Sequence, residues 1–124
     1  MMPRSFLESA LAGACPSFND EWTVLRQTYP PDEPPSARAF LGALRAHLLQ
    51  QLALGRVAEL TRLFYALERL LGEADPILEE LLTDELIAPL ARELAGTSID
   101  PRLVLPHLGR RTRRAWDRAT EADG

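Results

Sequence analysis

The sequence predicts an all-α fold, a single-domain helical bundle of about five to seven helices around a central antiparallel helix hairpin at residues 36–72. Leucine and alanine dominate the chain, and β-branched residues are scarce. Apolar residues recur at spacings of three and four, the period of an α-helix, and no stretch alternates as a half-buried strand requires. The 124 residues fit one domain, with an ordered core at about residues 5–119 and a frayed tail at 120–124.

Two short helices are expected ahead of the hairpin. The first spans residues 5–14 and ends before Pro16, and the second begins after Ser17, whose hydroxyl is expected to cap it. Residues 29–35 (Tyr-Pro-Pro-Asp-Glu-Pro-Pro) predict a stiff, extended connector. The apolar stripe of the second helix holds much of the aromatic content of the chain: Phe18, Trp22, Leu25 and Tyr29.

The hairpin consists of two amphipathic stretches separated by Gly55. Ser36 is the expected N-cap of the first stretch, and Gly72 is expected to end the second in a left-handed conformation. One helix over the whole span would be roughly twice the usual length. We therefore expect a turn at Gly55, with the two apolar faces burying each other. Leu63 and Leu70 widen the second face, which predicts that this helix touches two neighbours.

Proline divides the C-terminal half into shorter helices. Asp-Pro pairs at residues 75–76 and 100–101 are start signals, with aspartate as the N-cap and proline at the first helical position. Pro89 removes a backbone donor, which predicts a kink or break near residues 83–85 and two short helices in place of one. The last helix is expected to begin at about His107 or Gly109 and to end at Ala119.

Composition restricts where the protein acts. The net charge of −4 argues against general affinity for nucleic acid, and the single cysteine excludes an intrachain disulfide. No N-terminal run resembles a signal peptide, and no segment approaches the ~20 apolar residues that cross a bilayer. Every basic residue is arginine, which together with the abundant alanine and leucine indicates a GC-rich bacterial genome. We expect a bacterial, cytoplasmic protein without a membrane partner.

A run of arginines beside Trp116 is the densest charge feature. One interpretation is a nucleic-acid or anion contact, with arginine on phosphate and tryptophan stacked on a base. The interpretation that we favour is a solvated helix face with Trp116 in the core. An acidic run at residues 73–85 could pair with the arginines within one molecule or between two. The candidate interaction surface comprises Arg110, Arg111, Arg113, Arg114, Arg118, Glu79, Glu80 and Asp84.

No catalytic, cofactor-binding or metal site is predicted. His47 and His107 are the only histidines, and they do not have metal-ligand spacing with the single cysteine. Cys15 precedes a proline at a helix end, a pattern more typical of a small buried residue than of a nucleophile. The chain also lacks a glycine-rich phosphate loop and a nucleophile elbow.

The order of features resembles a family of small all-helical bacterial domains of unknown function. The residues that carry the resemblance are Pro-Pro-Ser-Ala-Arg-Ala-Phe-Leu-Gly-Ala-Leu at 34–44, the leucine-rich stretches at 57–73 and 77–90, and Leu-Pro-His-Leu-Gly at 105–109 before the arginine run. Members share a leucine-rich hairpin and an "LGP"-like entry to the last helix. Here Arg110 stands in place of that proline. The resemblance covers about residues 5–119 and implies the fold but no site residues.

These observations favour a non-enzymatic protein-interaction module, regulatory or immunity-like, with an unknown protein partner and no cofactor. Segregated acidic and arginine surfaces support this interpretation, because complementary charge promotes specific association. The alternative is a nucleic-acid or anion binder that uses the arginine run. A small-molecule pocket beside His47 or Tyr65 is a third hypothesis. The sequence leaves homodimerisation open for each of them.

Overall fold

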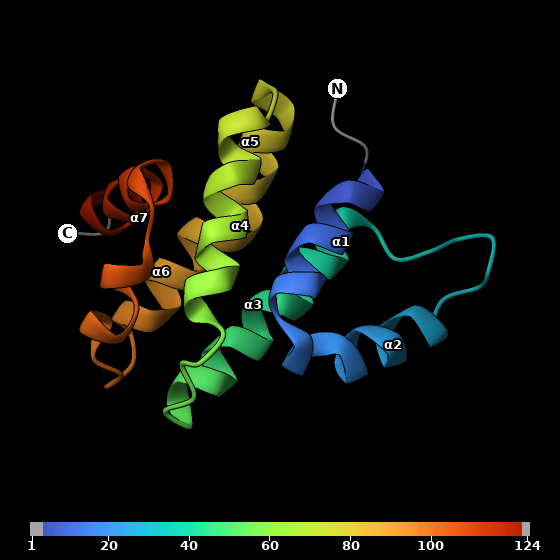
Figure 1. The fold of residues 1–124 in the computed structure, drawn as a ribbon, viewed down its shortest axis with the longest axis horizontal. Coiled ribbons are helices and arrows are strands. Elements are labelled where there is room, and N and C mark those ends of the chain that lie inside the picture. The colour runs from blue at the N-terminus through green and yellow to red at the C-terminus, as the bar shows by residue number, and fades with distance from the viewer. Residues whose placement is uncertain (1–3, 123–124) are drawn as a thin grey trace.

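A computed structural model describes residues 4–122, with side chains described for residues 6–121 (Figure 1). Over this range the chain is all-helical and has no strand, which confirms the predicted all-α, single-domain class. Its seven α-helices are α1 Arg4–Ala14, α2 Asn19–Gln27, α3 Ala37–Ala53, α4 Leu60–Glu73, α5 Pro76–Leu82, α6 Ala88–Ala95 and α7 Arg110–Ala122. The chain also forms 3₁₀ turns at Pro16–Phe18, Pro101–Leu103 and Leu105–His107, and a π-helical segment at Thr83–Ile87.

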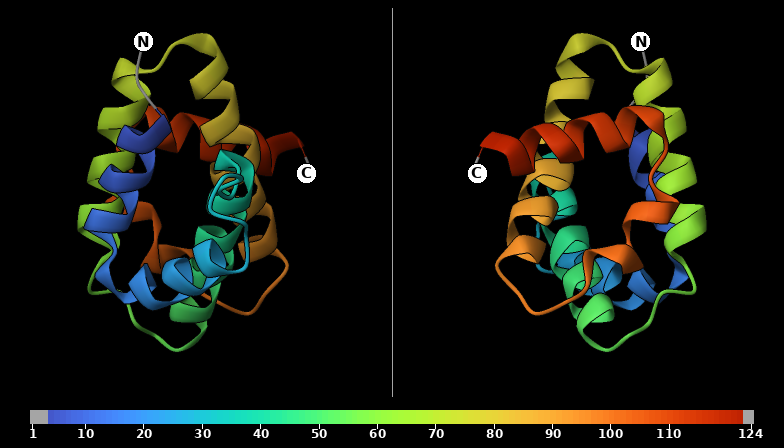
Figure 2. Two further views of the ribbon diagram at one scale, coloured as in Figure 1. Left: turned by 90° about the vertical axis from the view of Figure 1, so that its right-hand side faces the viewer. Right: turned by 90° about the vertical axis from the view of Figure 1, so that its left-hand side faces the viewer.

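Helices that are distant in the sequence pack around one apolar core. α1 lies along α4, α4 also contacts α7, and α7 packs across α6 (Figures 1 and 2). α3 packs against the π-helical segment and α6, and α2 contacts α3. No helix in the described part of the chain is both long enough and apolar enough to cross a membrane. The largest fully buried side chains come from both halves of the chain: Phe18, Phe40, Phe64, Leu7, Leu11, Leu41, Leu44, Leu63, Leu67, Leu82, Leu86 and Ile87.

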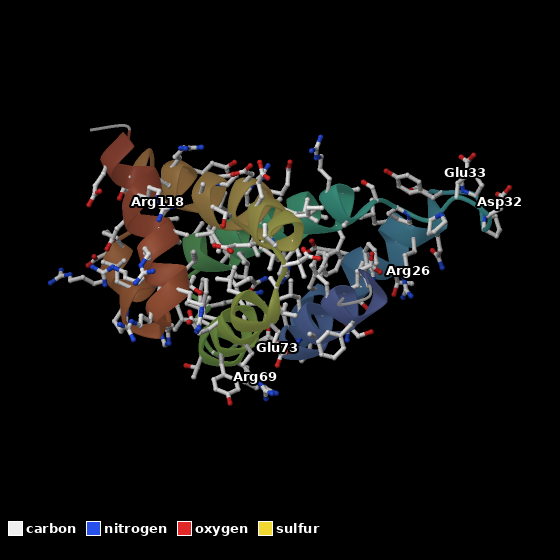
Figure 3. All side chains as sticks on the ribbon, turned by 90° about the horizontal axis from the view of Figure 1, so that it is seen from above. Arg26, Asp32, Glu33, Arg69, Glu73 and Arg118 are labelled. Carbon is white, nitrogen blue, oxygen red and sulfur yellow. The ribbon has the colours of Figure 1, made fainter. Side chains whose placement is uncertain are left out.

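Local signals placed most helix starts correctly. Ser36 Oγ accepts a hydrogen bond from Ala39 N–H at 3.0 Å, and Asp75 Oδ1 accepts one from Leu78 N–H at 2.8 Å. The predicted connector extends from one end of the molecule between α2 and α3 (Figure 3). α7 continues to Ala122 beyond its predicted end, and residues 123–124 of the predicted frayed tail lie outside the described residues.

The hairpin forms as two helices, but it packs differently from the prediction. Gly55 has φ of +72°, the left-handed conformation that glycine tolerates, and it lies in the turn between α3 and α4. The most extensive contacts of α4 are with α1 and α7, which confirms its predicted two neighbours. Those of α3 are with the π-helical segment and α6. The expectation that the two faces mainly bury each other is therefore wrong, because each broad face meets helices from outside the hairpin. Gly72 lies within α4 and does not end it in a left-handed conformation.

The chain passes Pro89 through a π-helical turn rather than a break. Ala88 N–H donates to the carbonyl of Thr83, five residues back, and this wider turn joins α5 to α6. Proline has no N–H, so the carbonyl of Glu85 lacks its α-helical donor. Arg45 Nη1 of α3 donates to that carbonyl at 2.9 Å, and Arg45 Nε forms an ion pair with Glu93 at 3.2 Å. A side chain from α3 thus replaces the missing helical hydrogen bond.

Replacing Arg45 with alanine should lower the free energy of unfolding by about 1–3 kcal/mol, because a partly buried carbonyl loses its donor. Arg38→Ala is the matched control. Arg38 also contacts Glu85, at 2.8 Å, but its side chain is 75% exposed, so its removal should cost about 1 kcal/mol or less. Urea denaturation of both variants measures the difference. Equal losses would show that the carbonyl contact does not matter.

The N-terminus of α7 is capped by a carboxylate from α4. Glu68 accepts hydrogen bonds from Arg111 N–H at 3.0 Å and from Thr112 N–H and Oγ1 at 2.9 and 3.0 Å. Burial alone would raise the pKa of Glu68, but these hydrogen bonds outweigh it and lower the pKa below its ordinary value of 4.5. Gly109 allows this approach, because a Cβ there would overlap the Glu68 carboxyl group.

Glu68→Gln should destabilise the protein by about 1–2 kcal/mol near neutral pH, because the cap loses its charge and an acceptor oxygen. The folded-state pKa is lowered, so the stabilisation is full above about pH 4.5 and is lost as the pH falls through the folded-state pKa. Denaturation curves of wild type and variant at several pH values should therefore converge in acid. Glu73→Gln, at an exposed position of the same helix, is the control, and a pH-independent difference would contradict the argument.

Candidate functional site

A buried histidine on α3 is the centre of a polar cluster. The His47 side chain is 2% exposed, and the Phe18 ring lies 5.4 Å from its ring, centre to centre. Apolar positions of α3 on either side of it, Leu44 and Leu48, are also buried, so helical periodicity places His47 at the edge of the core. Its polar neighbours come from three other segments: Cys15, Ser17, Glu21 and Glu59.

Both ring nitrogens of His47 have partners. Nδ1 lies 2.8 Å from Glu21 Oε1, and Nε2 lies 2.8 Å from Ser17 Oγ. The Ser17 hydroxyl donates to Glu59 Oε1, and Ser17 N–H donates to Glu59 Oε2 at 3.0 Å. The predicted capping role of Ser17 is therefore wrong: its hydroxyl caps no helix and instead binds the start of the α4 region.

Proton accounting defines what this cluster can do. Serine has one hydroxyl proton, and here Glu59 accepts it. Ser17 Oγ can then only accept at its contact with His47, so Nε2 of His47 is the donor there. A serine–histidine–carboxylate order is present, but in this arrangement the histidine is not the acceptor of the serine proton. The Ser17 hydroxyl is therefore held rather than activated.

The pKa values of Cys15 and Glu59 shift in opposite directions. Burial raises the pKa of the Cys15 thiol to about 11, the nearby Glu59 charge adds to the rise, and the hydrogen bond with Ser17 opposes it. Burial alone would raise the pKa of Glu59, but hydrogen bonds from Ser17 and Cys15 lower it below its ordinary value of 4.5. At neutral pH, Cys15 is a protonated thiol beside an ionised carboxylate.

The cluster forms one wall of a recess of about 810 Å³ at the α3–α4 turn. Its volume is within the usual range of small-ligand pockets. A second recess, of about 270 Å³, lies beside Tyr65, so both places named by the small-molecule hypothesis are hollowed, and the hypothesis itself stays a prediction. Residues at and next to the Gly55 turn also line the larger recess: Gln51, Leu54, Gly55, Arg56 and Val57.

The structure brings together only part of the candidate interaction surface predicted from the sequence. All of its residues are exposed, and the side chain of Trp116 is buried at 4% exposure, as the favoured interpretation of the arginine run expects. The acidic and arginine runs meet at a small recess of about 150 Å³, which Glu79 lines together with Arg111, Arg114 and Arg118. Arg111 pairs with Glu68 at 3.5 Å and Arg113 with Asp117 at 2.9 Å. Glu80 and Asp84 do not line that recess.

Sequence reasoning missed the His47 cluster because no motif connects its members. Ser17 and Glu21 are four residues apart, but His47 and Glu59 follow after 26 and 38 further residues. A buried position for a histidine within the leucine stripe of α3 was the one available signal. It indicates that polar partners are required, but it does not identify them.

The Cys15 thiol should be inert in the folded protein, because it is 1% exposed and its pKa is raised to about 11. An aromatic disulfide reagent at neutral pH should release no thiolate from the native protein and one equivalent after unfolding in urea. The single cysteine makes the assignment direct. Rapid labelling of the native protein, at the rate of a free thiol, would contradict both the burial and the pKa.

A family model described as a domain of unknown function (DUF7674) matches residues 9–122, and the chain belongs to this family. The match spans nearly the same region as the resemblance seen in the sequence, and it confirms that resemblance. No match was found among curated proteins or among solved structures.

Proposed function

We propose that this DUF7674 domain is a non-catalytic protein-binding module that docks a protein partner on its charged α7 surface. We define this surface by six exposed side chains of the acidic and arginine runs: Arg110, Arg114, Arg118, Glu79, Glu80 and Asp84. Of these, Glu79, Arg114 and Arg118 line the recess between α5 and α7. The proposal rests on one observation: opposite charges meet at this recess without partners. Within residues 6–121, none of these six side chains forms an ion pair or hydrogen bond.

Charge complementarity describes the expected partner. Arginine is enriched at protein interfaces and binds carboxylates in a planar, two-point geometry. A partner with acidic side chains opposite the α7 arginines and a basic group opposite Glu79 would place each charge against its opposite, which would also fix the orientation of the complex. Arg118 lies at the end of the molecule opposite Asp32 and Glu33, so the acidic connector does not screen it (Figure 3).

The same surface gives less support to nucleic-acid binding. Stacking on bases requires an exposed aromatic ring, and Trp116 is buried. Three acidic side chains of the surface would also repel a phosphate backbone. Two observations support a non-catalytic role. The Ser17 hydroxyl donates its proton to Glu59, and the raised pKa of Cys15 keeps its thiol protonated at neutral pH.

The test is capture from the source organism with three tagged proteins: wild type, Arg114→Glu/Arg118→Glu, and the matched control Arg62→Glu/Arg69→Glu, which reverses two exposed arginines of α4. A protein recovered by wild type and control should then be purified and titrated calorimetrically. We expect about tenfold or weaker binding by the α7 variant, and a loss of affinity at high salt.

Equal affinity of all three proteins for the recovered partner would overturn the assignment to α7. Recovery of nuclease-sensitive material alone would instead favour the nucleic-acid alternative. A dimer by light scattering that the α7 variant abolishes would identify a second copy of this chain as the occupant, and so would contradict a separate protein partner.

A further inference from the structure

Three different metal-ligating groups meet inside the His47 cluster. The Cys15 sulfur, an imidazole nitrogen of His47 and a Glu59 carboxylate oxygen all lie within 4.8 Å of one another. They come from three segments, namely the residue before the first 3₁₀ turn, the middle of α3 and the residue before α4.

The spacing fits a tetrahedral zinc ion. Zinc bonds of about 2.0–2.3 Å place neighbouring ligand atoms roughly 3.3–3.8 Å apart. The Cys15 Sγ to Glu59 Oε1 distance is 3.4 Å. The Ser17 oxygen lies among all three groups, 3.8 Å from the sulfur, 2.8 Å from His47 Nε2 and in hydrogen-bond contact with Glu59 Oε1. An ion that replaced this hydroxyl would therefore be surrounded by the three ligands.

A second contact prepares the histidine for this role. Glu21 Oε1 holds Nδ1 of His47 at 2.8 Å and leaves Nε2 directed at the shared space. A carboxylate on the outer nitrogen is the arrangement that orients metal-binding histidines. The ligand set also selects the ion, because sulfur and imidazole nitrogen favour zinc, whereas magnesium and calcium prefer oxygen ligands alone.

We propose that Cys15, His47 and Glu59 bind one Zn²⁺ ion, with Glu21 orienting His47 and Ser17 rotating aside. As they become ligands, Cys15 Sγ and His47 Nε2 each release a proton to solvent. Three protein ligands leave the fourth position open toward the 810 Å³ recess, where water completes the tetrahedron. This inference does not depend on the proposed protein-binding function, since the ligands lie outside the charged α7 surface.

Cobalt(II) is the probe for the test, because it occupies zinc sites and absorbs light when a thiolate binds it. The full chain, freed of metal by a chelator, should show a sulfur-to-cobalt charge-transfer band that saturates at one equivalent of Co²⁺ and disappears when one equivalent of Zn²⁺ is added. The chain has a single cysteine, so this band identifies Cys15 as the ligand without any substitution. Absence of the band at saturating Co²⁺ would overturn the proposal.

Substitutions separate the remaining roles. Glu21→Gln should weaken Co²⁺ binding about tenfold or more, as expected for a group that orients a ligand, while keeping the charge-transfer band. His47→Gln should abolish the band. His107→Gln is the matched control, because the His107 ring lies 3.0 Å from Thr61 Oγ1 and is not one of the proposed ligands, so this variant should leave the titration unchanged.

Ser17→Ala keeps the test valid if His47→Gln fails to fold, since it removes only the hydroxyl that occupies the shared space. It should bind Co²⁺ at least as tightly as wild type. Much weaker binding by Ser17→Ala, or a band lost in His107→Gln and retained in His47→Gln, would contradict the assigned ligands.

Discussion

A histidine buried in an apolar helix face must find a partner for each ring nitrogen, and this requirement organises the first half of the molecule. His47 meets it with Glu21 on α2 and Ser17 in the preceding turn, and Ser17 in turn binds Glu59 ahead of α4. A buried polar group without a partner would cost about 1–3 kcal/mol. Directional hydrogen bonds therefore define how the α1–α2 junction sits on α3 and α4, in addition to the less specific apolar packing.

In the second half of the molecule, side chains from distant helices supply hydrogen bonds to two sets of backbone groups that have no helical partner. Pro89 leaves the carbonyl of Glu85 without its helical donor, and Arg45 of α3 supplies one. The first N–H groups of α7 have no helical acceptors, and Glu68 of α4 accepts from two of them. In each case a defect created by local sequence is corrected by a side chain from a distant helix. These corrections connect α3 and α4 to the C-terminal helices.

Sequence reasoning succeeded where the interaction is local. Ser36 and Asp75 were predicted as caps because their partners lie three residues away. The favoured interpretation of the arginine run also placed Trp116 in the core, where it lies. It failed where the partner lies far along the chain. Ser17 looked like a cap, yet its hydroxyl binds a carboxylate 42 residues later. The packing of the hairpin was also missed, because a broad apolar face requires neighbours without specifying which helices provide them.

The Glu68 carboxyl group occupies the space that a side chain at position 109 would need. This steric constraint has an evolutionary consequence. A methyl group at position 109 would overlap the carboxyl group at position 68, so position 109 cannot gain a side chain while Glu68 keeps its present place. Loss of the carboxylate would remove the selective need for glycine, and a side chain at 109 would first require a shorter residue at 68. The two positions should therefore vary together among descendants of this chain, although 41 residues separate them in the sequence.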